Sequence, residues 1–181
     1  MNMRNAPHML SDMIAVVEYD EAYRMPCVDL LVELQEHLVS VDNENIQVLT
    51  ENYYKNYMDY VLLLSREHHG QMYIALQNNV IVGLIAGLIE EKDKEDYLTN
   101  RCPVRGIITE LIVTREARGL GIGKLLMDRM EKYFGTNNCE YTSVSAFAPN
   151  HIAVDFYEEL GYTVRNIELT KRINRKQPLM I

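Results

Sequence analysis

Runs of apolar residues along the chain change in period between two and about 3.6, and these changes mark out strands and helices. In the first third of the chain, the short β-branched run Met13–Tyr19 predicts a strand. Leucines at helical spacing predict a helix over Val28–Val39, and a second helix is predicted over Glu51–His68. Gly70, just beyond it, is typical of a residue that ends a helix.

A β-hairpin is predicted next. The apolar runs Gln71–Gln77 and Val80–Ile89 are separated only by Asn78 and Asn79, and asparagine tolerates the positive φ angles of a two-residue turn. Two glycines inside the second run indicate a bulge or a close backbone contact. The charged stretch that follows, Glu90–Arg105, is expected to be a long surface loop.

Strands and helices alternate in the second half of the chain. A strand is predicted over Gly106–Thr114, a helix over Leu120–Phe134 and a strand over Glu140–Phe147. A short helix over His151–Leu160, ended by Gly161, and one or two final strands over Tyr162–Ile173 follow. Residues 1–12 are expected to be a loose leader and 174–181 a tail, around a core of about 13–173. This order predicts an α/β (mixed α+β) fold, with helices on both faces of a mixed sheet.

Tyrosines form a second pattern on the helix predicted over Glu51–His68. Tyr53, Tyr54, Tyr57 and Tyr60 recur at a spacing that is expected to place them on one broad face. Such a face serves either as a stripe that packs on the core or as an aromatic wall for a bound molecule. The spacing favours the core-facing interpretation.

Composition limits the classes of protein to which the chain can belong. Its 181 residues fit a single domain, 1–181, and 48% apolar residues are enough for a core without metals or disulfides. A net charge of −8 argues against a nonspecific nucleic-acid binder. The longest apolar run, ten residues, falls short of the roughly 20 that span a membrane. Three widely spaced cysteines form neither a disulfide framework nor a zinc pattern, so no metal site and a cytoplasmic location are expected.

The most informative segment is a glycine-rich turn, Arg118–Lys124 (RGLGIGK), between a predicted strand and a predicted helix. Glycines let the backbone approach a ligand and point N–H groups at it, and the following helix adds the positive end of its dipole. These features predict a site for a phosphate or pyrophosphate, with a tight turn that binds nothing as the alternative. The spacing does not satisfy the P-loop, the dinucleotide fingerprint or the kinase glycine loop.

Two segments together carry a resemblance to a known family. Arg118, Gly121 and Gly123 fit R-x-x-G-x-G, and Asn150–Tyr162 fits N-x-x-A-x-x-F-Y-x-x-x-G-[FY]. In this order they resemble the GNAT superfamily of N-acetyltransferases, clearly over residues 70–172. The resemblance implies a central mixed, mostly antiparallel, twisted sheet and acetyl-coenzyme A (acetyl-CoA) as acetyl donor. It also implies a possible homodimer that pairs through the final strands.

The resemblance further implies roles for particular residues. Tyr157 would be the general acid that protonates the thiolate leaving group, and backbone N–H groups near Val113 would stabilise the oxyanion. Glu110 is the candidate general base, with a purely structural carboxylate as the alternative. The expected contacts of acetyl-CoA are Ile112, Val113, Thr114, Arg118, Gly119, Leu120, Gly121, Ile122, Gly123, Lys124, Asn150 and Tyr157.

The function predicted in this way is transfer of an acetyl group to a primary amine of a small molecule or peptide. Cys139 has no nearby base in the sequence that would favour a covalent acetyl-cysteine step, so direct attack in a ternary complex is predicted. Two alternatives stay open at this point: a catalytically inactive module that binds coenzyme A and regulates a partner, and a nucleotide-binding α/β protein. Neither nucleic acid nor a membrane is an expected partner.

Overall fold

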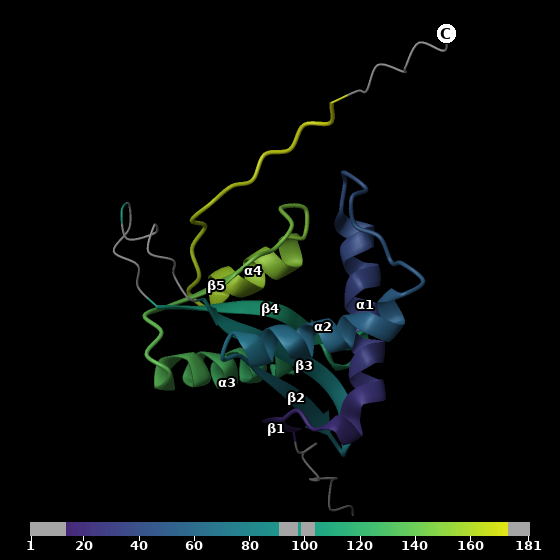
Figure 1. Cartoon of the computed structure of the whole chain (residues 1–181), viewed down its shortest axis with the longest axis vertical. Helices are drawn as coiled ribbons and strands as arrows, with labels where there is room; N and C mark the ends of the chain where they lie inside the picture. The colour runs from purple at the N-terminus through teal and green to yellow at the C-terminus, as the bar shows by residue number, and fades with distance from the viewer. Residues whose placement is uncertain (1–13, 91–97, 99–103, 174–181) are drawn as a thin grey trace, which may run out of the picture.

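The computed structural model describes residues 14–90, 98 and 104–173, which include one five-stranded sheet in the order β1-β2-β3-β4-β5 (Figure 1). Strands β1 to β4 pair antiparallel with their neighbours, whereas β5 runs parallel to β4. The strands are Ile14–Glu18 (β1), Gln71–Gln77 (β2), Val80–Glu90 (β3), Arg105–Val113 (β4) and Tyr141–Val144 (β5). The expected leader and tail, and most of the expected loop over Glu90–Arg105, lie outside the described residues.

Helices cover both faces of this sheet. They are α1 (Arg24–Val41), α2 (Tyr53–Glu67), α3 (Ile122–Thr136) and α4 (His151–Glu159), with short 3₁₀ turns at Glu21–Tyr23 and Arg115–Ala117. Residues of α1 and α2 pack on one face, whereas α3 packs on the other, together with partly buried residues of α4. The predicted mixed, mostly antiparallel sheet between helices is therefore confirmed. Among the described helices, none is long and apolar enough to cross a membrane.

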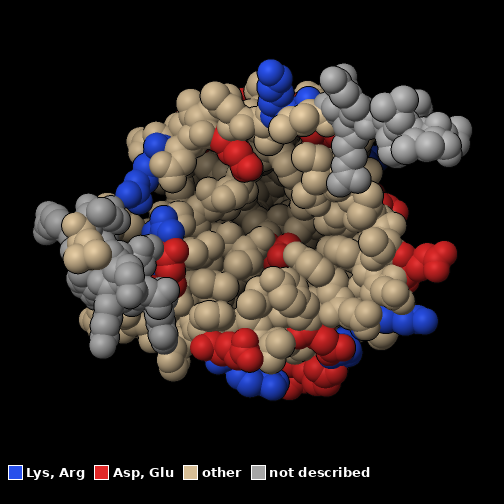
Figure 2. Space-filling model, turned by 45° about the horizontal axis from the view of Figure 1, so that its top comes forward, with Lys and Arg blue, Asp and Glu red and all other residues tan. Residues whose placement is uncertain are grey.

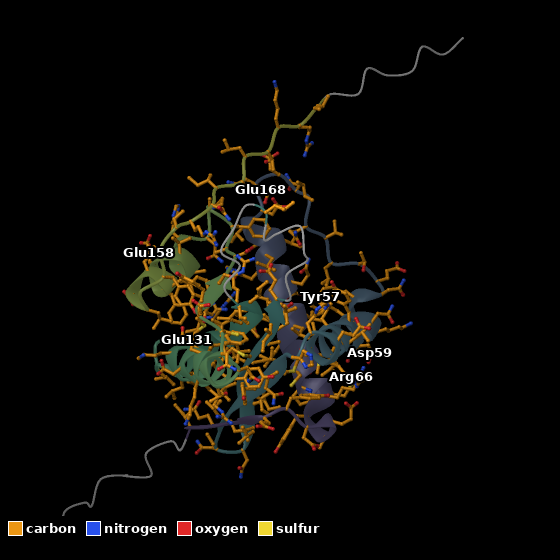
Figure 3. The ribbon with its side chains drawn as sticks, turned by 60° about the vertical axis from the view of Figure 1, so that its left-hand side comes forward. Tyr57, Asp59, Arg66, Glu131, Glu158 and Glu168 are labelled. Carbon is orange, nitrogen blue, oxygen red and sulfur yellow. The ribbon has the colours of Figure 1, made fainter. Side chains whose placement is uncertain are left out.

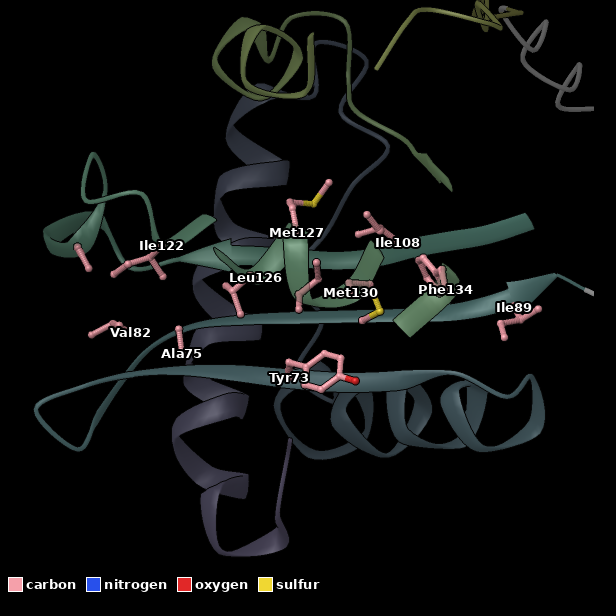
Figure 4. Packing of buried hydrophobic residues seen from close by; sticks show 12 residues of the cluster. Tyr73, Ala75, Val82, Ile89, Ile108, Ile122, Leu126, Met127, Met130 and Phe134 are labelled. Carbon is pink, nitrogen blue, oxygen red and sulfur yellow. The ribbon is translucent and has the colours of Figure 1, made fainter. Parts of the chain in front are cut away.

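Each face of the sheet has its own hydrophobic cluster. In the cluster on the α3 face, α3 places its apolar side chains across the middle strands (Figure 4). The cluster on the opposite face joins α1 and α2 to the same strands. The fully buried anchors of the two clusters include Tyr73, Leu126, Met130 and Phe134 on the α3 face and Leu31, Met58, Ile74 and Leu84 on the other.

The predicted hairpin and bulge are both present. Asn78 and Asn79 have φ angles of 51° and 63°, as a two-residue turn between β2 and β3 requires. The β3–β4 register shifts between Ala86 and Gly87. A Cβ atom on Gly87 would lie 2.8 Å from the Ile107 carbonyl oxygen and 2.8 Å from the Phe134 ring, so a side chain there would displace the neighbouring strand or helix.

Two predictions need correction, one about the tyrosines of α2 and one about the length of β5. The tyrosines of α2 do not share one face, because Tyr54 and Tyr60 are 47% and 52% exposed whereas Met58 and Val61 are buried. The buried stripe is thus narrower than the tyrosine spacing suggests. The strand expected over Glu140–Phe147 is only four residues long, because β5 stops pairing with β4 at Val144.

The prediction of final strands over Tyr162–Ile173 is wrong. None of these residues is in a strand, and the segment leads away from the body of the protein (Figure 1). Ile167, Leu169 and Ile173 are 78%, 90% and 85% exposed. The alternation of apolar and polar residues is real, but a strand also needs a neighbour for its backbone hydrogen bonds, and no described strand pairs with this segment.

Candidate active site

The sheet separates between β4 and β5. Their pairing runs from Arg105 opposite Tyr141 to Ile108 opposite Val144, whereas β4 continues to Val113. The Thr114 N–H donates to the Val82 carbonyl of β3 at 2.9 Å. Because N–H groups alternate sides along a strand, those of Leu111 and Val113 point away from β3, toward the side that β5 has left. Within the described residues, this stretch of β4 therefore offers the N–H groups of Leu111 and Val113, which have no partner, to a ligand.

The glycine turn supplies a second set of unpaired donors. Gly119 and Gly121 have φ angles of 78° and 76°, which glycine adopts without strain. Gly121 caps α3 without a side-chain hydrogen bond, and the first-turn bond is from Leu125 N–H to the Gly121 carbonyl at 3.1 Å. The N–H groups of the first three residues of α3 therefore have no acceptor within the helix. With no acidic residue in this turn, its free N–H groups and the positive end of the helix suit an anion.

Gly123 links the two sequence motifs physically. A Cβ atom on Gly123 would lie 3.2 Å from Cζ of Phe156, so glycine allows α4 to approach the first turn of α3 closely. Ile122 is buried in the core, so it has only backbone groups to offer a ligand. Ile112 is buried too, and it lies opposite Leu84 in the same phase as the Thr114–Val82 bond, so its N–H faces β3 and the predicted contact with a ligand is not supported. Leu120, by contrast, is 53% exposed on the turn itself.

The two cations of the turn already have partners. Arg118 donates from Nε to the Val113 carbonyl at 3.0 Å, and its Nη2 lies 3.6 Å from a carboxylate oxygen of Glu33 on α1. Lys124 lies 3.0 Å from Asp128, one turn further along α3. Arg118 thus braces the end of β4, and Lys124 forms a surface ion pair. The predicted contacts of both residues with phosphates stay predictions.

A shallow cavity lies beside this brace. Its volume is about 220 Å³, and it is lined by Pro26, Asp29, Leu30, Glu33, Ile81 and Thr114. Thr114, an expected ligand contact, therefore faces a space between α1 and the end of β4. On a larger scale, the face of the molecule shown in Figure 2 is deeply hollowed, with acidic side chains at its rim and inside it.

Glu110 is a buried carboxylate on the α2 side of the sheet. It is 8% exposed, and Tyr57 of α2 donates a hydrogen bond from Oη to Oε1 at 2.7 Å. Burial raises the pKa of Glu110 to about 7, and the Tyr57 hydrogen bond opposes that rise. A carboxyl group that titrates near neutral pH is suited to exchange protons. No pattern in the sequence connects Tyr57 with Glu110, because 53 residues separate them.

Tyr157 is held by its aromatic neighbours on the other side of the sheet. Its ring centroid lies 5.4 Å from that of Phe156 and 5.9 Å from that of Tyr162, and the Tyr162 hydroxyl donates to Glu131 of α3 at 2.8 Å. No described residue hydrogen-bonds to the Tyr157 hydroxyl. Burial raises the pKa of Tyr157 to about 12, so the phenol keeps its proton at neutral pH.

Asn150 caps α4. Its Oδ1 accepts a hydrogen bond from the Ala153 N–H at 3.3 Å, which is the structural role that its position before a helix suggests. The predicted contact between Asn150 and the ligand stays a prediction. In the part of the chain that the structure describes, no three His, Cys, Asp or Glu residues gather as metal ligands.

The candidate residues divide between the two faces of the sheet. Glu110 lies with α2 and Tyr157 packs with α3 and α4; in Figure 3, Tyr57 of α2 lies on one side and Glu131 and Glu158 on the other. The glycine turn, the end of β4 and α4 are joined by the Arg118 and Gly123 contacts. The point where β4 and β5 separate lies between these two groups of residues in the sheet.

Comparisons with known proteins identify relatives of this arrangement. The chain is 34% identical over 90 residues to an uncharacterized N-acetyltransferase of Methanocaldococcus jannaschii, covering 42% of this chain and 58% of that protein. It is 28% identical over 131 residues to the catalytic subunit of the N-terminal acetyltransferase B complex of Schizosaccharomyces pombe, covering 70% and 66%. The chain thus spans less than two thirds of either relative.

A solved structure with the same fold and a sequence-family model also match the chain. A mutant form of a Bacillus halodurans protein has a solved structure that superimposes with a TM-score of 0.78 at 15% identity, covering 88% of this chain and 99% of that one. The model of the Acetyltransferase (GNAT) family matches residues 33–162, which include β2 to β5, the glycine turn and α4. The chain belongs to the GNAT family of acetyltransferases.

Proposed function

We propose that the protein transfers the acetyl group of acetyl-CoA to a primary amine, which attacks the thioester directly while both substrates are bound. Members of the GNAT family use acetyl-CoA as co-substrate. The observation that carries the proposal is that the fold has two sets of backbone N–H groups without acceptors among the described residues. One set lies along β4 beyond Ile108, and the other lies at the start of α3. They suit the two ends of a long, phosphate-bearing thioester.

The residues present fit such a donor. N–H groups of Ile122, Gly123 and Lys124 would bind the pyrophosphate, since the helix end is positive and uncapped. The free N–H groups of Leu111 and Val113 would bond the amide-bearing arm. The Val113 N–H would also stabilise the negative charge that develops on the thioester oxygen.

Two side chains then manage the protons of the reaction. A lysine-type ammonium, with a pKa of about 10.4, cannot attack until it loses a proton, and Glu110 takes that proton directly or through water. The free amine adds to the thioester carbon, and the C–S bond breaks as the resulting oxyanion collapses. The second proton that the nitrogen must lose passes to solvent. Tyr157 supplies a proton to the departing sulfur, a role for which its high pKa keeps it protonated.

Initial-rate kinetics test the proposal. With both substrates varied, the double-reciprocal lines are expected to intersect, and Tyr157→Phe is expected to lower kcat by about 10²–10³-fold with unchanged acetyl-CoA affinity. Tyr141→Phe, which removes a hydroxyl from a residue that is 61% exposed on β5, is the matched control. Parallel lines would reveal a covalent acetyl-enzyme instead. Acetyl-CoA binding without turnover on any amine would favour the inactive module.

The acceptor panel for these measurements includes peptides and small molecules. A peptide with a free N-terminus is the first choice, because the S. pombe relative is named as the catalytic subunit of an N-terminal acetyltransferase. A peptide that carries only a lysine amine and an amino sugar complete the panel. Acetylation of any member supports the activity, and the rates rank the acceptors.

The exposed C-terminal segment supports a homodimer. Ile167, Leu169 and Ile173 in this segment are exposed and would share one side if the segment were extended, and β5 has no described strand beyond it. A second copy of the chain would cover this apolar side and pair with the free edge. Light scattering after gel filtration is expected to give a dimer mass, and a double Ile167→Lys, Leu169→Lys variant a monomer. A wild-type monomer at tens of micromolar would rule the dimer out.

A further inference from the structure

A row of tyrosines connects α1 to the carboxylate of Glu110. The Tyr53 hydroxyl donates to the Leu31 carbonyl of α1 at 3.2 Å. The rings of Tyr53 and Tyr57 stack, with centroids 4.4 Å apart and planes 16° from parallel. The Tyr57 hydroxyl donates to Glu110 at 2.7 Å. The backbone of one helix is thus linked, through two rings of the next helix, to a buried carboxylate on the sheet.

Tyr57 is the dominant polar neighbour of Glu110. The residue opposite Glu110 on β3 is Ala86, which offers no side-chain hydrogen bond, and among the described residues no Lys, Arg or His forms an ion pair with it. The titratable groups that face it from α2 are Tyr57 and, further off, Tyr53. The state of the carboxylate therefore depends on burial and on one hydroxyl.

We propose that Tyr57 is a positioning residue for Glu110. The Tyr57 hydroxyl holds the Glu110 carboxylate in one orientation and favours its charged form. This inference rests on the proposed role of Glu110 as the base. A hydroxyl that donates to a carboxylate stabilises the charged form, because that form is the better acceptor. The stack on Tyr53, itself bonded to α1, fixes where the hydroxyl lies.

Removal of the hydroxyl has two separable effects. Without the hydroxyl, no described residue opposes the effect of burial, which favours the neutral form of Glu110. A higher pH is then needed to generate the charged base. The acid limb of the kcat/KM profile is therefore expected to move up by about one pH unit in Tyr57→Phe. The freed carboxylate also loses its fixed orientation, so kcat at high pH is expected to fall by about 3–10-fold, with KM for acetyl-CoA unchanged.

Four variants separate the possibilities. Tyr57→Phe keeps the ring that stacks on Tyr53 and removes only the hydroxyl. Tyr54→Phe removes a hydroxyl from an exposed tyrosine of the same helix and is the matched control, whose profile is expected to superimpose on that of the wild type. Tyr53→Phe weakens the anchor to α1 and is expected to give an intermediate shift. Glu110→Gln tests the base itself.

Carboxyl NMR gives a readout that does not depend on activity. Protein labelled with ¹³C at glutamate carboxyls is titrated, and the Glu110 signal is assigned by its absence in Glu110→Gln. Its titration midpoint is expected to rise in Tyr57→Phe and to stay in place in Tyr54→Phe.

The outcomes distinguish failure of this inference from failure of the proposed function. If Glu110→Gln loses activity while both the profile and the Glu110 midpoint of Tyr57→Phe match the wild type, the role of Tyr57 is overturned and the base assignment stands. If Glu110→Gln keeps full activity, the base assignment fails, and the role of Tyr57 falls with it. A raised midpoint with a shifted acid limb supports both.

Discussion

A Gly121→Glu variant is expected to lose acetyl-CoA binding while it keeps its fold. Gly121 caps α3, beside the N–H groups that are proposed to bind the pyrophosphate, and nothing lies within 4 Å of the Cβ atom that a side chain would add. The added carboxylate would thus meet no steric obstacle, but it would repel phosphates and compete for the same donors. Calorimetric titration is expected to show micromolar binding by the wild type, worth about 8 kcal/mol, and at least about 100-fold weaker binding by the variant.

Two control variants isolate the charge. Gly121→Ala carries the same strain at a φ angle of 76°, about 1–2 kcal/mol, without the carboxylate, so it is expected to bind several-fold less tightly at most. Gly135→Glu adds the same charge in open space at the other end of α3 and is expected to bind like the wild type. If Gly121→Glu binds acetyl-CoA as tightly as Gly121→Ala does, the pyrophosphate does not lie on this turn.

Glu110→Gln is expected to lower kcat by about 10²–10⁴-fold, as loss of a general base does. The amide keeps the size of the side chain and can still accept the Tyr57 hydrogen bond, but it cannot take a proton from the amine. Acetyl-CoA affinity is expected to be unchanged, since Glu110 lies on the α2 side of the sheet. In the wild type, kcat/KM is expected to rise with pH through about 7, because the base must be ionised. Activity near that of the wild type would mean that Glu110 is structural.

The same substitution has a consequence for stability that runs opposite to its effect on rate. The folded-state pKa of Glu110 is raised, from 4.5 to about 7, so its stabilising contribution is complete below about 4.5 and is lost as pH rises through 7. At about 1.36 kcal/mol for each pH unit, the upper bound of that loss is about 3 kcal/mol. Denaturant unfolding is therefore expected to find Glu110→Gln more stable than the wild type at pH 8 and equal at pH 4.5. Equal stability at both pH values would contradict the raised pKa.

Local signals in the sequence predicted much of the fold and one part of the site. The hairpin at Asn78 and Asn79 needs only a turn that accepts positive φ, and the glycine turn needs only its own residues and the helix after it. Both are properties of a short segment, so both are visible in the letters of that segment. The bulge at Gly87 was also indicated, although the close approach of Phe134 that explains it was not.

The features that the sequence did not predict depend on pairs of distant segments. Tyr57 and Glu110 meet only because α2 packs on the face of the sheet where the Glu110 side chain lies, and no residue pattern in either segment indicates the other. The early end of β5 depends on where it leaves β4, and the residues of 162–173 show the alternation of a strand without the neighbour that would make them one. Hydrophobic patterns indicate which face of a helix or strand is apolar, but not which other element packs against that face.

The short pairing of β5 also bears on how tightly the protein can bind. Only four residues of β5 pair with β4, and neither β5 nor α4 contains a fully buried residue, so this corner has little burial to oppose local opening. A ligand that spans both strands binds only the closed form. The fraction of molecules already closed therefore scales the observed affinity, and substitutions that rigidify this corner would tighten binding without touching the ligand.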